Sequence, residues 1–286
     1  MEKSEKNKAE KSTLYLVGTP IGNLSDISQR AVKILSEVDF VAAEDTRNSM
    51  KLLSFFGIKK ELVSYYEHNK KSSGEKIVER LLSGENCALI TDAGMPAISD
   101  PGEDIVRLCA DAGITVSVIP GPSAFVSALA LSGLSTSRFC FEGFLPAQHT
   151  ERMKRLTSLQ KEERTLCFYE APHKLKSTLS DMEEVFGGDR KITLCRELTK
   201  LNEEIIRTTL SLANSIYSEK EPRGEYVLIL EGADPCQISD ENPLLKLSVC
   251  EHTEHYISQG MAKMDAIKKV AKDRGVSKSV IYKELL

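Results

Sequence analysis

The chain has 286 residues, of which 41% are hydrophobic and 28% charged, and its formal net charge is −4 at pH 7. A chain of this length can bury a good core and suggests one large or two modest domains, with an ordinary globular composition. Its acidic balance argues against a protein whose whole surface binds nucleic acid. The seven cysteines are far apart and most lie in apolar runs, which predicts reduced core thiols in a cytosolic protein.

Neither the N-terminal segment nor the long uncharged stretch in the middle of the chain predicts a membrane or export segment. Residues 1–12 are highly charged and lack an apolar segment, so we expect a frayed tail and no signal peptide. Residues 112–137 carry no charge, but Pro120, Gly121 and Pro122 interrupt them and serines dilute them. We therefore expect no segment that spans a bilayer.

From its beginning to about Ser132, the chain alternates short apolar runs with helical patterns. The expected helices include one that Asp26 caps, with apolar Ala31, Ile34 and Leu35. The expected strands are 14–17, 40–43, 62–65, 88–91 and 115–119, and the later helices are 48–56, 75–82 and 104–112. Five strand-then-helix units are typical of a parallel sheet with helices on both faces.

The stretch from 88 to 124 holds two of these strands and the loops that follow them. We expect both loops to leave the carboxyl ends of neighbouring parallel strands, where open α/β sheets bind their ligands. The first loop, DAGMPAISDPG, contains two glycines and two prolines in eleven residues. Proline stiffens a loop, and glycine lets a ligand approach the backbone. The loop therefore indicates a binding site, although two tight turns would account for the same residues.

After Gly133 the pattern changes, and we expect a hinge at residues 133–136 followed by a second α/β domain. Its strands look antiparallel and exposed on one side. We expect them at 138–144, 165–169, 191–195, 204–208 and 225–231, with helices at 151–160 and 174–186. A cleft between two domains is a usual place for a small ligand.

Loop residues from 233 to 243 precede a helical tail, with helices expected at 244–259, 263–274 and 277–285. Gly275 and Ser277 fit the glycine turn and serine cap of a helix-turn-helix. Between residues 260 and 286, seven basic residues stand against three acidic ones. The tail therefore suggests a nucleic-acid contact, and a solvated helix pair that packs on the body is the alternative.

The loop after the first strand excludes the common phosphate-binding motifs. Residues 18–23, GTPIGN, lack the G-x-G-x-x-G spacing, and Pro20 stands where a backbone donor would be needed. The chain also lacks a Walker A lysine loop. A ligand held at strand ends without phosphate machinery suggests a nucleoside without phosphates, and S-adenosylmethionine fits.

Eight motifs occur in order along residues 14–232: GTPIGNLSD, AAEDTR, ITDAGMPAISDPG, PGPSA, FEGFLP, YEAPHKL, RELTK and GEYVLILEG. Together they resemble the ribosomal RNA small-subunit methyltransferase I family, a branch of the tetrapyrrole-methylase-like enzymes. Met95, Ala171 and Lys174 depart from the threonine, serine and arginine that are usual there. The lysine keeps the positive charge but loses the bidentate fork of arginine.

The resemblance implies an α/β protein with the two-domain tetrapyrrole-methylase-like fold and a small helix-turn-helix-like C-terminal domain. It implies a tail at 1–12, α/β domains at 13–133 and 134–232, and an RNA-contacting helical domain at 243–286. It also implies a cytoplasmic homodimer with S-adenosylmethionine between the two α/β domains. The expected reaction is methyl transfer to the ribose 2′-hydroxyl of a cytidine in the decoding region of 16S rRNA, in the small ribosomal subunit.

The resemblance also assigns candidate site residues. Those expected to bind the cofactor are Pro20, Gly94, Met95, Ile98, Ser123, Ala124, Tyr169 and Leu198. Those expected to bind RNA are Lys174, which lies in the motif YEAPHKL, and Lys268, Lys272 and Lys278, which come from the basic charge of the tail and not from the motifs. For each of them the alternative is a turn, core or surface role, and Ile98 and Leu198 fit a core equally well.

The reaction needs an in-line 2′-oxygen, exclusion of water and a group that accepts the hydroxyl proton. Glu197 and Lys200 are three residues apart beside Leu198, so they are the first candidates, with Glu170 as a third. Structural salt bridges would explain these charges as well. His252 and His255 have no acid or cysteine ligand beside them, so we expect surface residues and no metal. The charged groups considered were Glu44, Asp45 and Arg47; Glu170, His173 and Lys174; and Arg196, Glu197 and Lys200, with Glu203 and Glu204 behind them.

Two other functions stay open at this point. One is a small-molecule methylase acting on a tetrapyrrole or another planar acid, which would have no use for the basic tail. The other is a non-enzymatic nucleic-acid binder that takes S-adenosylmethionine only as an effector. The charged residues in the strand-end loops argue against it, because a pure binding pocket could be mostly apolar.

Overall fold

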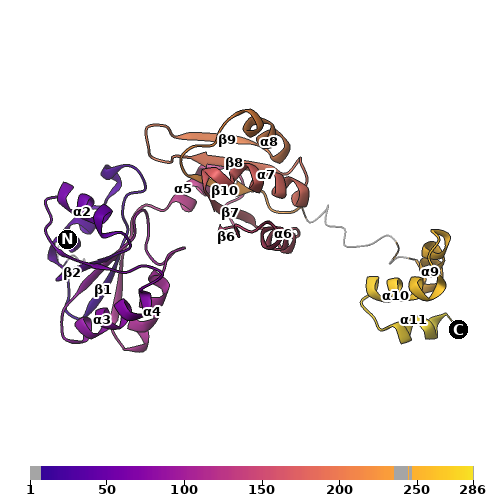
Figure 1. Cartoon of the computed structure of the whole chain (residues 1–286), viewed down its shortest axis with the longest axis horizontal. Coiled ribbons are helices and arrows are strands. Elements are labelled where there is room, and N and C mark those ends of the chain that lie inside the picture. Colours follow the sequence, from indigo (N-terminus) through magenta and orange to yellow (C-terminus); the bar gives the residue numbers. More distant parts are fainter. Residues whose placement is uncertain (1–7, 235–243, 245–246, 286) are drawn as a thin grey trace. The chain divides into compact units, whose positions relative to one another are not determined.

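The computed structural model describes residues 8–234, 244 and 247–285. The chain divides into two compact units, Met1–Gly232 and Ala233–Leu286 (Figure 1). Residues 1–7 of the predicted tail and most of the predicted linker lie outside the described residues. The first unit contains two sheets of five strands each, and the second unit contains helices.

The first sheet is parallel throughout and has the strand order β3-β2-β4-β1-β5. Its strands are β1 (Thr13–Val17), β2 (Phe40–Ala43), β3 (Glu61–Ser64), β4 (Cys87–Ile90) and β5 (Thr115–Ile119). The five predicted strand-then-helix units are confirmed. The prediction that the strands of the 88–124 stretch are neighbours is wrong, because β1 lies between β4 and β5. Strand order depends on the direction of each crossover, which the hydrophobic pattern does not encode.

Alternate side chains of the first sheet enter two different cores. Tyr15 and Val17 pack with α1 (Gln29–Glu37) and α2 (Thr46–Phe55) on one face. Leu14 packs with α3 (Lys70–Leu82) and α4 (Gly102–Asp111) on the other face. This is the period of two that places successive strand residues on opposite faces. Helices on both faces explain why the strands read as continuous apolar runs.

The start of α1 differs from the prediction. Ser28 caps this helix, and its hydroxyl accepts a hydrogen bond from the N–H of Ala31 at 3.1 Å. Asp26, the predicted cap, lies in the preceding 3-10 turn Leu24–Asp26. Both residue types are good caps, so the sequence alone did not separate them.

The second sheet has the order β6-β7-β10-β8-β9 and mixes both strand directions. Its strands are β6 (Phe139–Phe144), β7 (Thr165–Glu170), β8 (Lys191–Arg196), β9 (Glu204–Thr209) and β10 (Tyr226–Leu230). The prediction of antiparallel strands is wrong for β6 and β7, which run parallel. The helix α6 (His149–Ser158) connects them as the crossover that parallel strands require. The other pairs are antiparallel.

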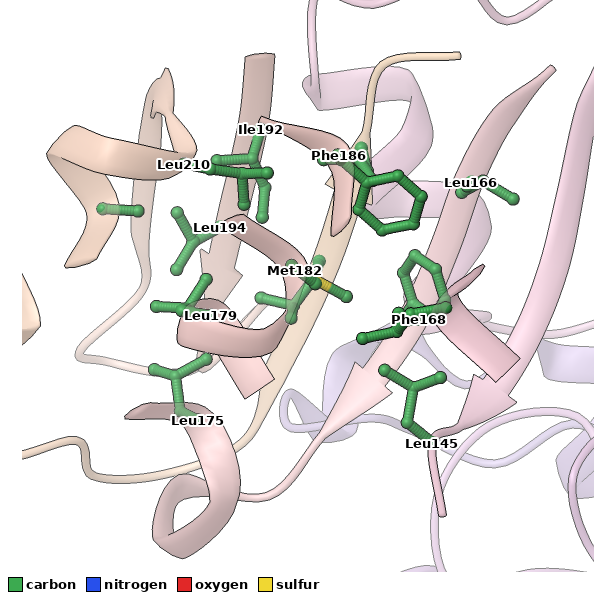
Figure 2. Close-up of a cluster of buried hydrophobic side chains, with 14 of the residues drawn as sticks. Leu145, Leu166, Phe168, Leu175, Leu179, Met182, Phe186, Ile192, Leu194 and Leu210 are labelled. Atoms are coloured by element: carbon green, nitrogen blue, oxygen red, sulfur yellow. The ribbon is translucent and has the colours of Figure 1, made fainter. Parts of the chain in front are cut away.

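The second sheet is covered on both faces, whereas the sequence predicted one exposed side. On one face, α7 (Pro172–Phe186) and α8 (Leu210–Glu219) contribute to a large core, where Met182 lies among leucines and Phe168 (Figure 2). The helix α8 was not predicted. On the other face, α5 (Ala124–Leu131) packs against β7 and β10. The helix α5 therefore packs in the core of the second sheet, whereas the sequence analysis placed it with the first sheet in a domain at residues 13–133.

The second unit contains α9 (Val249–Ser258), α10 (Lys263–Asp273) and α11 (Lys278–Glu284) (Figure 1). The predicted three-helix tail is confirmed, although α9 starts at Val249, after a capping box formed by Ser248 and Glu251. Gly275 takes a φ of 65° in the turn between α10 and α11, a conformation that suits glycine. The small core that joins the helices consists of Val249, Ile267, Val270, Ala271 and Ile281.

The prediction that His252 lies on the surface is wrong. Its side chain is fully buried between α9 and α10, where Nδ1 accepts a hydrogen bond from Nε of Arg274 at 3.3 Å. Its Nε2 lies 3.5 Å from Oδ2 of Asp273. Burial, and next the charge of Arg274, lower the pKa of the imidazole. A helical pattern places His252 on the apolar face of α9, which the sequence analysis overlooked in favour of its polarity.

The cysteines largely follow the prediction of core thiols. Cys87, Cys109, Cys167 and Cys195 are buried, whereas Cys250 is exposed. Among the described helices, none combines the length and apolar character needed to cross a membrane.

Candidate functional site at the carboxyl ends of the first sheet

The loops after β1 and β4 are joined directly by backbone hydrogen bonds. The N–H of Thr19 donates to the carbonyl of Gly94 at 2.9 Å, and the N–H of Gly94 donates to the carbonyl of Thr19 at 3.2 Å. The Thr19 hydroxyl also donates to the carbonyl of Thr91 at 3.1 Å. These bonds fix the start of the glycine- and proline-rich loop beside Pro20.

The loops after β1 and β5 touch through two glycines. A Cβ added to Gly18 would lie 2.6 Å from Cα of Gly121 and 2.7 Å from Sδ of Met95. A Cβ added to Gly121 would meet the Gly18 backbone at 2.8 Å. No side chain larger than hydrogen fits at this crossing. Neither glycine was predicted as a site residue, although both lie in the loops that follow predicted strands.

The rest of the loop after β4 has an unusual backbone. Ala97 and Ser99 take positive φ angles of 69° and 62°, which cost non-glycine residues on the order of 1–3 kcal/mol each. Asp100 holds the loop in this shape, because its Oδ1 accepts from the N–H groups of Ala97 at 2.9 Å and Gly102 at 2.7 Å. Its Oδ2 is buried and, within the described part of the chain, has no hydrogen-bond partner.

Aromatic side chains of α5 and of the second sheet cluster together with Ile21 of the loop after β1. The rings of Phe125 and Phe141 stack with centroids 4.3 Å apart, and Tyr169 packs edge-on against Phe141 at 5.0 Å. Burial raises the pKa of the Tyr169 hydroxyl. Ser123 and Ala124 lie half-buried at the start of α5, and Ile98 is 47% exposed.

The turn after β8 brings Glu197 and Lys200 to the loop after β1. Nζ of Lys200 donates to Oε1 of Glu197 at 2.9 Å and to Oε2 of Glu225 at 2.8 Å. A Cβ added to Gly22 would lie 2.5 Å from Cγ of Lys200 and 2.7 Å from Oγ1 of Thr199. Thr199 and Glu197 have φ angles of 66° and 52°, so this turn is strained as well.

The hydrogen bonds decide the charge of this pair. Burial alone would raise the pKa of Glu197, but the bonds from Lys200 and from the N–H of Glu225 outweigh it and lower that pKa. Burial lowers the pKa of Lys200, but its bonds to Glu225 and Glu197 outweigh that effect and raise it. Glu197 is therefore a carboxylate and Lys200 an ammonium near neutral pH, so Lys200 is not available as a base.

Next to this pair lies a cleft of about 630 Å³. Its walls come from the loops after β1 and β4, from α2 and from the Lys200 turn. The lining residues are Pro20, Ile21, Gly22, Leu24, Asn48, Ser49, Lys51, Leu52, Phe55, Thr91, Asp92, Ala93, Lys200 and Glu225. A volume of this size is typical of small-ligand sites. The residues of α2 were not predicted as part of the site, because Leu52 and Phe55 look like core positions of an amphipathic helix.

The acidic motif that precedes α2 lies at the same edge of the sheet. Oε2 of Glu44 accepts from the Thr91 hydroxyl at 3.1 Å. Burial and the charge of Asp92 raise the pKa of Glu44, and together they outweigh the hydrogen bond from Thr91, which lowers it. Asp45 caps α2 and pairs with Arg47 at 3.0 Å, so these two residues stabilise the helix start.

The remaining candidates lie apart from the cleft lining. Glu170 is buried at the start of α7, where its carboxylate accepts from the N–H of Ala171 at 2.8 Å and from the Thr178 hydroxyl at 2.6 Å. Both bonds stabilise the beginning of α7 and leave Glu170 with a structural role. Lys174 is partly exposed in the first turn of that helix.

The predicted RNA-binding lysines of the second unit are all exposed. Lys268 pairs with Asp265 at 2.8 Å. Lys272 and Lys278 belong to α10 and α11. Among the described residues, no group of three or more His, Cys, Asp or Glu side chains has the geometry to hold a metal ion.

Comparison with known proteins agrees with the motif pattern. Residues 13–213 match the family model of the tetrapyrrole (corrin/porphyrin) methylases. The ribosomal RNA small subunit methyltransferase I of Bacillus subtilis is 49% identical over 276 residues, which cover 96% of this chain and 94% of that protein. The protein of the same name from Halalkalibacterium halodurans is 47% identical over 281 residues, covering 98% and 97%.

Two solved structures share the fold at low sequence identity. The cobalamin biosynthetic enzyme cobalt precorrin-4 methyltransferase has a TM-score of 0.58 at 18% identity, covering 77% of this chain and 95% of that one. Diphthine synthase has a TM-score of 0.60 at 16% identity, covering 77% and 90%. At these identities the likeness concerns the fold alone.

Proposed function

The chain belongs to the ribosomal RNA small subunit methyltransferase I family, within the tetrapyrrole methylases, and from this premise we propose its reaction. It transfers a methyl group from S-adenosylmethionine to the ribose 2′-hydroxyl of a cytidine in the decoding region of 16S rRNA. The observation that carries this proposal is the 49% identity to a namesake of that family over 96% of the chain. Membership makes the chain an rRNA methyltransferase, and the atom and the nucleotide are the proposed part.

The strand-end loops fit the proposed cofactor. Gly18 and Gly121 let two backbones cross, and the buried Oδ2 of Asp100 and Oγ1 of Thr199 are left without partners in the described chain. Such atoms suit a cationic ligand with several polar groups, because a buried polar atom without a partner costs free energy. The residues that would hold the cofactor are Pro20, Gly94, Met95, Ile98, Ser123, Ala124, Tyr169 and Leu198.

When bound, S-adenosylmethionine supplies an electrophilic methyl group on a sulfonium. Glu197, a carboxylate held by Lys200 at the edge of the cleft, then serves as the acceptor of the 2′-hydroxyl proton. Lys200 holds the Glu197 carboxylate in place and offers a positive charge beside the cleft. Glu170 supports the start of α7 and takes no part in this proposal.

The assembly and the RNA contacts complete the proposal. The protein works as a cytoplasmic homodimer on the small ribosomal subunit, as the family resemblance implies. Lys268, Lys272 and Lys278 of the helical tail, with Lys174 of α7, contact RNA phosphates, because exposed lysines supply the salt-dependent part of RNA binding.

Mapping ribose methylation in 16S rRNA from cells with and without this gene tests the proposed reaction. We expect the 2′-O-methyl group of one decoding-region cytidine to disappear with the gene and return when the gene is restored. A methylation map that does not change would reject the proposal, and loss of a base methyl group would reject the 2′-hydroxyl as acceptor.

A further inference from the structure

The large cleft has a smaller neighbour that shares one wall with it. A second hollow of about 350 Å³ is lined by Leu24, Ser25, Ile27, Gln29, Val32, Phe55 and Phe56. Leu24 and Phe55 line both hollows and therefore form the ridge between them. The ridge runs from the loop after β1 to the last residue of α2.

The ridge is apolar and open to solvent. The side chain of Phe55 is 64% exposed and that of Leu24 is 39% exposed. The Phe55 ring packs edge-on against Phe56, with centroids 4.9 Å apart, which holds its orientation. The helix buries Leu53 instead, so Phe55 is not needed for the core. An exposed aromatic side chain between two hollows is a platform on which a planar group can stack.

Polar groups that suit a nucleotide surround the ridge in the larger cleft. Lys51 is exposed and forms no ion pair within the described part of the chain. Nδ2 of Asn48 donates to Oδ2 of Asp92 at 3.2 Å across the cleft. This pair offers a carboxylate that can accept from the exocyclic amine of cytosine. The same cleft is lined by Pro20 and Lys200, which the proposed function places at the reaction site, and by Ala93.

We propose that the two hollows bind consecutive nucleotides of an unpaired RNA segment, with Phe55 wedged between their bases. The larger cleft takes the target cytidine, its ribose toward Pro20 and its base against Phe55, and the smaller hollow takes the neighbouring base. A target ribose must leave the stacked strand to reach the cofactor, and unpaired bases of RNA bind proteins by stacking on aromatic side chains. Lys51 contacts a backbone phosphate of this RNA segment. The inference rests on the proposed function.

Five substitutions test the ridge in the full-length protein acting on small ribosomal subunits that lack the methyl group. Phe55→Ala should lower kcat/KM by about fivefold to a hundredfold, the range for one lost base–aromatic stack. Phe55→Trp should keep most of the activity, because the stacking face remains. Met50→Ala is the matched control: it is 58% exposed on the same helix and lines neither hollow. Lys51→Gln should reduce the slope of log K against log salt by about 0.7. Lys59→Gln should not, because Lys59 is an exposed lysine that lines neither hollow.

The outcomes separate this inference from the proposed function. Equal activities of the Phe55→Ala and Met50→Ala variants, or equal losses from Phe55→Ala and Phe55→Trp, would overturn the stacking role. A wild-type protein that leaves the subunit unmethylated would overturn the proposed function together with this inference. A photo-crosslinking benzoylphenylalanine at position 55 should attach to RNA, and attachment to a ribosomal protein would identify the ridge as a protein contact instead.

Discussion

The crossing of Gly18 and Gly121 gives the sharpest test of the cofactor loops. The Gly121→Ala variant adds a Cβ that would lie 2.8 Å from Cα and 2.9 Å from the carbonyl carbon and oxygen of Gly18. Real Cβ atoms do not approach backbone so closely, so the loops must separate by several tenths of an ångström. Overpacking of this kind costs about 1–3 kcal/mol. At about 2–4 °C per kcal/mol for a unit of this size, the melting temperature should fall by about 2–12 °C.

The Gly121→Ala variant should also bind S-adenosylmethionine more weakly, beyond its lower melting temperature. Calorimetric titration with S-adenosylmethionine should show at least a tenfold weaker Kd for Gly121→Ala. Gly113→Ala is the control, because Gly113 has a φ of 68° with nothing within 4 Å of the added Cβ. It should cost a comparable 1–2 kcal/mol through backbone strain alone, with an unchanged Kd. If the Gly121→Ala variant binds the cofactor like the wild type, the loops do not form the cofactor site.

Three further predictions concern the tail and the proposed base. Deleting residues 243–286 should leave the cofactor Kd unchanged and weaken RNA binding in a salt-dependent way. If the truncated protein methylates RNA at the full rate at every salt concentration, the tail has only a structural role. The pKa of buried His252 is lowered, so in acid the unfolded tail binds more protons than the folded tail does. The stability of the folded tail should therefore be constant above about pH 6.5 and decrease below it. Hydrogen exchange of α9–α11 at pH 8 and pH 5.5 checks this, and His252→Gln should remove the difference. Glu197→Gln should lower kcat about a hundredfold or more with an unchanged cofactor Kd, and a wild-type rate would exclude Glu197 as the base.

The local pattern predicted most elements, whereas their arrangement was partly wrong. Alternating strands and helices gave the first sheet correctly, but the position of β1 between β4 and β5 depends on crossover direction. The parallel pair of β6 and β7 followed from the helix between them, which the sequence analysis had identified without drawing that consequence. The helix α8 was missed, although its buried residues Leu210, Ala213 and Tyr217 recur at helical spacing.

The residues of the site were likewise only partly predicted from the sequence. Pro20, Gly94 and Met95 were named from the family resemblance, and their place in the loops that follow predicted strands, where ligands of α/β sheets bind, agrees with it. Phe55 was missed because its apolar character in a helix predicts burial, and only the fold shows it exposed. Glu170 was selected for its charge, but its buried bonds to the start of α7 depend on tertiary packing.

Methyl transfer from labelled S-adenosylmethionine to four substrates tests the central claim most directly. The substrates are the unmethylated small ribosomal subunit, a short RNA oligonucleotide and a DNA oligonucleotide with the decoding-region sequence, and a free tetrapyrrole. We predict efficient labelling of the subunit alone, on a ribose 2′-oxygen, because DNA lacks this hydroxyl. A short naked RNA oligonucleotide should be labelled poorly, since the small basic tail supplies few contacts without the surrounding RNA shape. Efficient labelling of the DNA or of the tetrapyrrole, with an unlabelled subunit, would contradict the account.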